Sequence, residues 1–253
     1  MKITRAVVPS LFTTLNVFCG FLSILNTHYG RIEMAAWFII LAAAFDTFDG
    51  MMARITKSTS QFGVELDSLA DVVSFGAAPS FMIYAAGLEA YGNWGIIVSS
   101  MPLAFGAIRL ARFNTQLVGF DKDYFKGLPI PAQAMTVCAF LFESYGESGL
   151  TAWGTIAIMP LTIILSLLMV SRIKYDTIPR PSRRVFAQHP LKTVGFAVAL
   201  LVVVFSKGRL LFLVMISFIL FGVARAGMAW LRLQARVLEK EDEDETEIQS
   251  IDI

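Results

Sequence analysis

Charged residues are scarce in this sequence: they make up 16% of its 253 residues, whereas a soluble domain usually carries about 25%. Hydrophobic residues make up 56%, and apolar runs of about 20 residues, long enough to cross a bilayer, recur along the whole chain. The scarcity of charge excludes an ordinary soluble domain and predicts an integral membrane protein. We expect membrane lipids among its partners and no nucleic acid.

Cysteine is also rare, since Cys19 and Cys138 are the two that the chain contains. Both fall inside apolar runs, where a cysteine behaves as a small buried hydrophobe, so nothing indicates a disulfide framework. The N-terminus lacks the features of a cleaved secretory signal. Met1–Val8 is a short basic lead-in, and the apolar run after Pro9 does not end in a small-residue cleavage site.

The apolar runs predict an all-α polytopic membrane bundle of about eight transmembrane helices. Gly, Asn, Pro or charged residues mark most of the connections between them, as expected for residues that interrupt helices. The candidate spans are Ser10–Asn26, Glu33–Met52, Asp67–Leu88, Trp94–Phe113, Pro131–Tyr145, Thr151–Ser171, Leu191–Ser206 and Leu210–Leu231.

Basic residues are distributed unevenly around these spans. With eight spans both termini lie on one side, and that side holds eighteen of the 21 Lys and Arg residues. Because Lys and Arg favour the cytoplasmic side of a membrane, both termini are predicted to be cytoplasmic. The asymmetry supports the count, since a miscounted span in the first half of the chain would remove it.

The chain divides into four predicted regions. Residues 1–175 form a core of six helices, 176–190 a basic cytoplasmic connection, 191–231 a C-terminal helical hairpin and 232–253 an acidic tail. The connection is expected to lie on anionic lipid. The tail contains the charge run Glu239–Glu247, which has almost nothing to bury, and it is expected to be disordered.

Four aspartates lie within or at the ends of predicted spans, where acidic residues are costly and usually functional. Asp46 and Asp49 are three residues apart near the end of the second span, and Asp67 and Asp71 are four apart at the start of the third. A short loop joins these spans, so the two pairs can converge. Two divalent cations would offset four carboxylates, and hard oxygen ligands suit Mg²⁺ or Mn²⁺.

Small residues continue the faces that carry the aspartates. Gly50 and Ala53 follow the first pair, which leaves room for a ligand against the helix, and Gly63, Ser74 and Ala78 share the face of the second pair. Aspartates at helix ends can also act as caps that pair with nearby basic residues. Two pairs at helical spacing, each with a stripe of small residues, favour a metal site over that interpretation.

The spacing of these residues follows the pattern D-x2-D-G-x2-A-R-x8-G-x3-D-x3-D. It comprises Asp46, Asp49, Gly50, Ala53, Arg54, Gly63, Asp67 and Asp71. This string resembles, without a gap, the signature of the CDP-alcohol phosphatidyltransferase family. Softer strings beginning at Pro9, Ser74, Arg109 and Lys126 resemble one branch of that family, the membrane-embedded phosphatidylserine synthases.

The resemblance implies transfer of the phosphatidyl group of CDP-diacylglycerol to the hydroxyl of L-serine, with release of CMP. It implies that the four aspartates hold two Mg²⁺ or Mn²⁺ ions and that Asp71 is the general base. Residues expected to line the nucleotide are Asp49, Gly50, Ala53, Arg54 and Gly63. The resemblance also implies a homodimer, placed in a bacterial inner membrane with its active site on the cytoplasmic side.

The acceptor alcohol is less firmly indicated than the reaction. A serine carboxylate needs a cation, which Arg109, Arg112 or Lys126 could supply, with Asn114 and Ser74 as polar contacts. The same cations would suit glycerol 3-phosphate or inositol phosphate, and choline is a further alternative. A cation transporter would instead need acids near the bilayer midplane and repeated discontinuous helices, whereas these acids cluster at one face.

Overall fold

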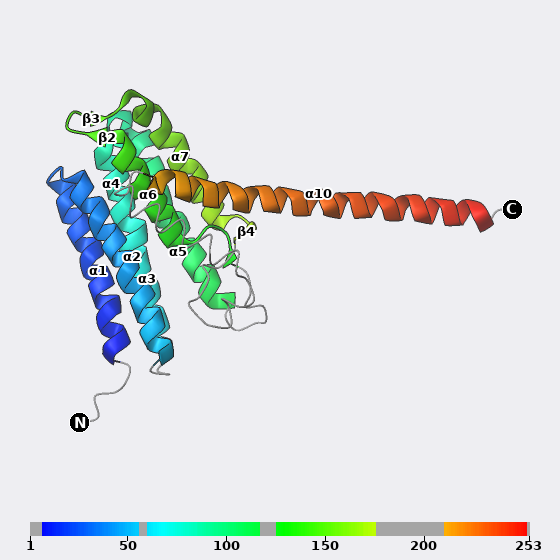
Figure 1. Ribbon diagram of the computed structural model, residues 1–253, viewed down its shortest axis with the longest axis horizontal. Coiled ribbons are helices and arrows are strands. Elements are labelled where there is room, and N and C mark those ends of the chain that lie inside the picture. The colour runs from blue at the N-terminus through cyan, green and yellow to red at the C-terminus, as the bar shows by residue number, and fades with distance from the viewer. Residues whose placement is uncertain (1–6, 56–59, 117–124, 176–209, 252–253) are drawn as a thin grey trace.

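The computed structural model describes residues 7–55, 60–116, 125–175 and 210–251, and helices dominate them (Figure 1). The main helices are α1 (Val7–His28), α2 (Ile32–Ile55), α3 (Gln61–Asp71), α4 (Ala78–Ala86), α5 (Gly92–Gln116), α6 (Ile130–Ser144), α7 (Ala152–Val170) and α10 (Leu211–Ile251). A π-helical turn, η1 (Val72–Ala77), joins α3 to α4, and a 3-10 turn, η2 (Leu88–Tyr91), precedes α5. Two short antiparallel pairings complete the described fold: β1 (Phe125–Lys126) with β4 (Lys174–Tyr175), and the hairpin of β2 (Tyr145–Gly146) with β3 (Gly149–Leu150).

The predicted all-α membrane fold is confirmed, although the count of eight spans is not. Within the described residues six helical segments are long and apolar enough to cross a membrane: Ser10–His28, Ile32–Met52, Gln61–Ala86, Leu88–Thr115, Ala152–Val170 and Leu211–Arg232. The predicted fifth span coincides with α6, whose 15 residues are fewer than the about 20 that a span needs. The predicted seventh span, Leu191–Ser206, lies outside the described residues, as does the connection 176–190.

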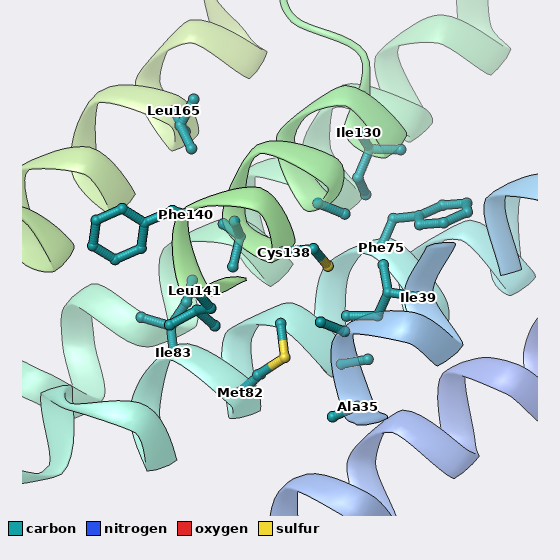
Figure 2. Packing of buried hydrophobic residues seen from close by; sticks show 14 of the residues in the cluster. Ala35, Ile39, Phe75, Met82, Ile83, Ile130, Cys138, Phe140, Leu141 and Leu165 are labelled. Carbon is teal, nitrogen blue, oxygen red and sulfur yellow. The ribbon is translucent and has the colours of Figure 1, made fainter. Parts of the chain in front are cut away.

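Helix α6 is short and is largely enclosed by the rest of the protein. Most of its residues are buried, and it packs against α2, α4, α7 and α10. Figure 2 shows Cys138 of α6 close to Phe75 of η1 and Ile39 of α2, so this cysteine is part of the hydrophobic core, as its apolar surroundings predicted. A helix enclosed in this way need not match the thickness of the lipid.

Helices α3 and α4 form one rod that the π turn interrupts directly after Asp71. Within it the N–H of Ala78 donates to the carbonyl of Val73, five residues back, and Pro79, which has no N–H to donate, follows at the start of α4. The hydroxyl of Ser74 in this turn donates to the backbone carbonyl of Asn16 in α1 at 2.8 Å. Single π turns are frequent at functional sites, and this one joins the second aspartate pair to α1.

The structure differs from the predicted disordered tail, because α10 continues to Ile251 and projects beyond the bundle (Figure 1). Its first part packs on the core, where Phe212 lies against Phe140 and Phe218 against Tyr175. Helix nucleation is costly whereas extension is not, and residues 228–251 contain neither Gly nor Pro. A lack of residues to bury therefore does not stop a helix that the membrane-spanning part has already nucleated.

A glycine with positive φ attaches the loop before α6 to the end of α7. Gly127 has φ +84°. Its N–H donates to the backbone carbonyl of Ile173 at 2.8 Å, and the N–H of Leu128 donates to the backbone carbonyl of Leu168 at 2.9 Å. A Cβ at Gly127 would collide with the backbone carbonyl of Met169. The loop can therefore pass this close to α7 only where the chain has no side chain.

Replacing Gly127 with alanine is expected to lower the thermal unfolding midpoint, because it adds both a backbone collision and a strained φ. Gly149→Ala is the matched control, since Gly149 has φ +94° but nothing within 4 Å of an added Cβ. Thermal unfolding in detergent should show a larger loss for Gly127→Ala. Equal losses would mean that φ strain alone, and no collision with α7, accounts for the effect.

Candidate metal and substrate site

The two aspartate pairs meet because α2 ends and α3 begins at the same end of the bundle (Figure 1). Ser60 caps α3, with its hydroxyl accepting from the N–H of Gly63 at 3.0 Å. Ligand oxygens of Asp46, Asp49 and Asp67 lie within 4.8 Å of one another. The carboxylate of Asp46 is also within hydrogen-bonding reach of Asp71, so all four aspartates form one cluster, as their spacing predicts.

The chemistry of the cluster fits divalent cations. Asp49 and Asp71 are buried, and one carboxylate oxygen of each, together with one of Asp67, has no hydrogen-bond partner in the part of the chain that the structure describes. Buried carboxylates without partners are very costly, and they repel one another at this separation. Carboxylate oxygens are preferred ligands of Mg²⁺ and Mn²⁺, so bound cations would remove both costs.

Helix α1 holds the first pair in place. The hydroxyl of Thr13 hydrogen-bonds to the carboxylate of Asp49, which also accepts from the backbone N–H of Gly50. On the same side of α1, the ring of Phe12 packs against Phe45 and Phe48 of α2 at centroid distances of 6.3 and 6.1 Å. These contacts fix the end of α2 and orient one carboxylate oxygen of Asp49, which leaves the other for a cation.

Helix α5 places a cation next to the second pair. Arg109 is only 8% exposed and interacts electrostatically with Asp71. It is the predicted acceptor contact that the structure brings to the aspartates. A buried guanidinium beside a carboxylate cluster can bind an anionic group of a substrate and can offset negative charge on Asp71.

Three of the other predicted acceptor contacts form hydrogen bonds to the protein itself. Arg112 donates to the carbonyl of Val170, the last residue of α7, at 3.2 Å. Asn114 donates to the hydroxyl of Ser68 at 3.0 Å, which links α5 to α3 beside Asp67. Ser74 is fully buried, and its hydroxyl is directed to α1. In this structure all three residues fix helices around the site.

Of the predicted nucleotide-binding residues, the structure describes Asp49, Gly50 and Gly63 in full. Gly50 is exposed, and a Cβ added to it would meet nothing within 4 Å, so the surface next to Asp49 is open. A Cβ at Gly63 would lie 3.2 Å from the Ser60 hydroxyl, which gives this glycine a role in the cap of α3. The side chains of Ala53, Arg54 and Lys126 lie outside the described part of the chain.

Sequence reasoning assigned no role to two residues of α1. Thr13 contacts Asp49, and Asn16 is fully buried with its backbone bonded to Ser74. The available signal was a polar or small residue at every third or fourth position of an otherwise apolar helix, at Thr13, Asn16, Gly20, Ser23 and Thr27. In membrane helices such a stripe faces the protein interior.

Known proteins resemble this chain over the region that contains the site. The family profile described as CDP-alcohol phosphatidyltransferase matches residues 6–165. A CDP-diacylglycerol–serine O-phosphatidyltransferase of Helicobacter pylori strain J99 is 41% identical over 173 residues, which is 66% of this chain and 70% of the relative. A protein of the same name from Bacillus subtilis strain 168 is 36% identical over 168 residues, 66% of this chain and 89% of the relative. An archaetidylserine synthase of Methanothermobacter thermautotrophicus is 37% identical over 180 residues, 70% of this chain and 73% of the relative.

The profile match covers more than half of the chain and includes α1, both aspartate pairs and the buried arginine of α5. The relatives are more than 30% identical over about two thirds of the chain. Together with the gathered aspartates and the apolar helices, this likeness identifies an integral membrane enzyme. The chain belongs to the CDP-alcohol phosphatidyltransferase family.

Proposed function

We propose that this protein transfers the phosphatidyl group of CDP-diacylglycerol to the hydroxyl of L-serine and releases CMP. The observation that supports this most directly is the cluster of Asp46, Asp49, Asp67 and Asp71, in which Asp49 and Asp71 are buried, with the buried Arg109 beside it. The names of the relatives supply the donor and the acceptor. Two divalent cations, Mg²⁺ or Mn²⁺, held by the four aspartates would stabilise the charge that develops on the leaving CMP and the attacked phosphate.

The side chains of the site have separate tasks in this reaction. Asp71 accepts the proton of the serine hydroxyl while a new bond forms between that oxygen and the phosphatidyl phosphorus. The bond from phosphorus to the CMP oxygen breaks, and CMP leaves with the electron pair. Arg109 binds the serine carboxylate, and the open face at Gly50 admits the nucleotide next to the first aspartate pair.

Placement in the membrane follows from the same arrangement. The aspartates, the start of α3 and the end of α5 lie at one end of the bundle, and we propose that this end faces the cytoplasm of a bacterial inner membrane, in a homodimer. Tyr29, exposed between α1 and α2, would then face outward. A cysteine introduced at this position should therefore react with an impermeant thiol reagent in intact cells. The two native cysteines, Cys19 and Cys138, are buried and should add little background labelling.

The proposed homodimer is tested by chemical cross-linking in membranes.

Purified protein in detergent should release CMP from CDP-diacylglycerol when L-serine and Mg²⁺ or Mn²⁺ are present, and a chelator should stop the release. Glycerol 3-phosphate, inositol phosphate and choline, offered separately, should give none. Release with one of these acceptors in place of serine would keep the reaction and overturn the serine assignment. Folded protein that releases no CMP with any of the four would overturn the proposed function.

A further inference from the structure

The amide of Asn16 is a buried polar group for which the described part of the chain supplies no partner. Asn16 lies in the middle of α1 and is 0% exposed. Neither its Oδ1 nor its Nδ2 has a hydrogen-bond partner within the residues that the structure describes. Since nearly all buried amides in folded proteins are hydrogen-bonded, this one is suited to a partner that binds from outside the chain.

Three contacts place this amide at the level of Asp71. Thr13, three residues or about 4.5 Å nearer the start of α1, bonds to Asp49. The backbone carbonyl of Asn16 accepts from Ser74, three residues beyond Asp71, and a Cβ at Gly20 would collide with the Ser74 hydroxyl. Helices α1 and α3 both start at the aspartate end of the bundle and run in the same direction (Figure 1). Asn16 therefore lies deeper than Asp49 and next to the segment that carries Asp71.

The chemistry of an amide narrows the class of ligand. Its oxygen accepts a hydrogen bond and its NH₂ donates two, so it pairs best with a ligand that carries a donor and an acceptor side by side. An amino acid has both, in its ammonium and carboxylate groups. The nucleotide is a weaker match, because the open face at Gly50 lies at the shallower end of the aspartate cluster.

We propose that Asn16 is a specificity residue that accepts a hydrogen bond from the ammonium group of the amino-acid acceptor, while Arg109 binds its carboxylate. The acceptor is then held between α1 and α5 with its hydroxyl at Asp71. This inference rests on the proposed function. A buried site built to hydrogen-bond a substrate group discriminates strongly against analogues that lack it, because its own polar groups would stay unpaired. Such a pair of contacts would favour serine over choline and glycerol 3-phosphate.

The test compares full-length Asn16→Leu, which has similar size and no polar atoms, with wild-type protein and with Ser23→Ala. Ser23 is the matched control, since it lies two turns further along the same face of α1 and is also fully buried, with a hydroxyl that has no partner among the described residues. The expected result for Asn16→Leu is a rise of about 10- to 150-fold in the KM for serine, as for a lost hydrogen bond to a charged group. The KM for CDP-diacylglycerol and the affinity for Mn²⁺ should change about twofold at most, and Ser23→Ala should leave the serine KM unchanged.

An unchanged serine KM in Asn16→Leu would overturn the inference. So would weaker Mn²⁺ binding without a change in serine KM, because Asn16 would then act on the metal cluster. If Asn16→Leu does not fold, Asn16→Ser provides the same test, since its shorter side chain cannot reach the ligand and must also raise the KM. Wild-type protein that is inactive with serine but active with another acceptor would overturn the proposed function itself, before any variant is compared.

Discussion

Replacing Asp71 with asparagine is expected to lower kcat for phosphatidyl transfer by about a thousandfold or more. Asn has almost the same shape as Asp but cannot accept a proton, and a positioned general base contributes about 10²- to 10⁴-fold. Asp71 is 8% exposed and interacts with both Asp46 and Arg109, so water cannot readily replace it. The substitution also removes one of the four negative charges that would hold cations, which adds to the loss.

The loss of the general base and the loss of a cation-binding charge can be separated by two measurements on the same protein. These are the rate of CMP release in a single turnover and the affinity for Mn²⁺. Glu65→Gln is the matched control, because Glu65 is an exposed acid on the same helix, and it should retain full activity. Activity of Asp71→Asn within about tenfold of wild type would contradict the assignment of Asp71 as the base. A large loss that excess Mn²⁺ restores would show that Asp71 acts chiefly as a ligand.

The convergence of the aspartates was predictable because it depends on local rules. Helical spacing places Asp46 with Asp49 and Asp67 with Asp71, and a short loop makes α2 and α3 neighbours. The residues that surround the cluster depend on distant packing instead. Arg112 meets the end of α7, 58 residues further along the chain, and the same separation applies to Ser74 and Asn16. No spacing rule in the sequence encodes such contacts, so the hydrogen bonds that Arg112, Ser74 and Asn114 make to neighbouring helices could not be predicted.

Two features of the fold depend on more than hydropathy and composition. Helix α6 is largely buried in protein, and hydropathy cannot distinguish such a helix from one that faces lipid, so the number of spans read from the sequence depends on how this helix is counted. The acidic tail has no residues to bury, and the extension of α10 needs none because the helix is already nucleated. The polar stripe of α1 is different: its spacing was visible in the sequence, and it indicated the face of α1 that packs inside the protein, where Thr13 contacts Asp49.

Arg109→Gln is expected to raise the KM for serine by about 30-fold or more, because removing one member of a buried charge pair costs about 2–5 kcal/mol. Glutamine keeps hydrogen-bonding ability and loses the positive charge next to Asp71. Arg109→Lys retains the charge without the paired N–H donors, so its KM for serine should lie between those of the wild type and Arg109→Gln. Steady-state kinetics at saturating CDP-diacylglycerol, with thermal unfolding as a check on folding, measures the effect.

Arg112→Gln is the control that separates substrate binding from general positive charge at this end of the bundle. Arg112 lies one turn further along α5, is half-buried and already donates to Val170. Its replacement should lower stability by about 1 kcal/mol and change the serine KM only a few-fold. If Arg112→Gln instead raised the KM more than Arg109→Gln, the acceptor would lie nearer the end of α7 and away from Asp71. Proton transfer from serine to Asp71 would then be excluded by distance, so this pair of variants tests the position of the acceptor as well as the residue that binds it.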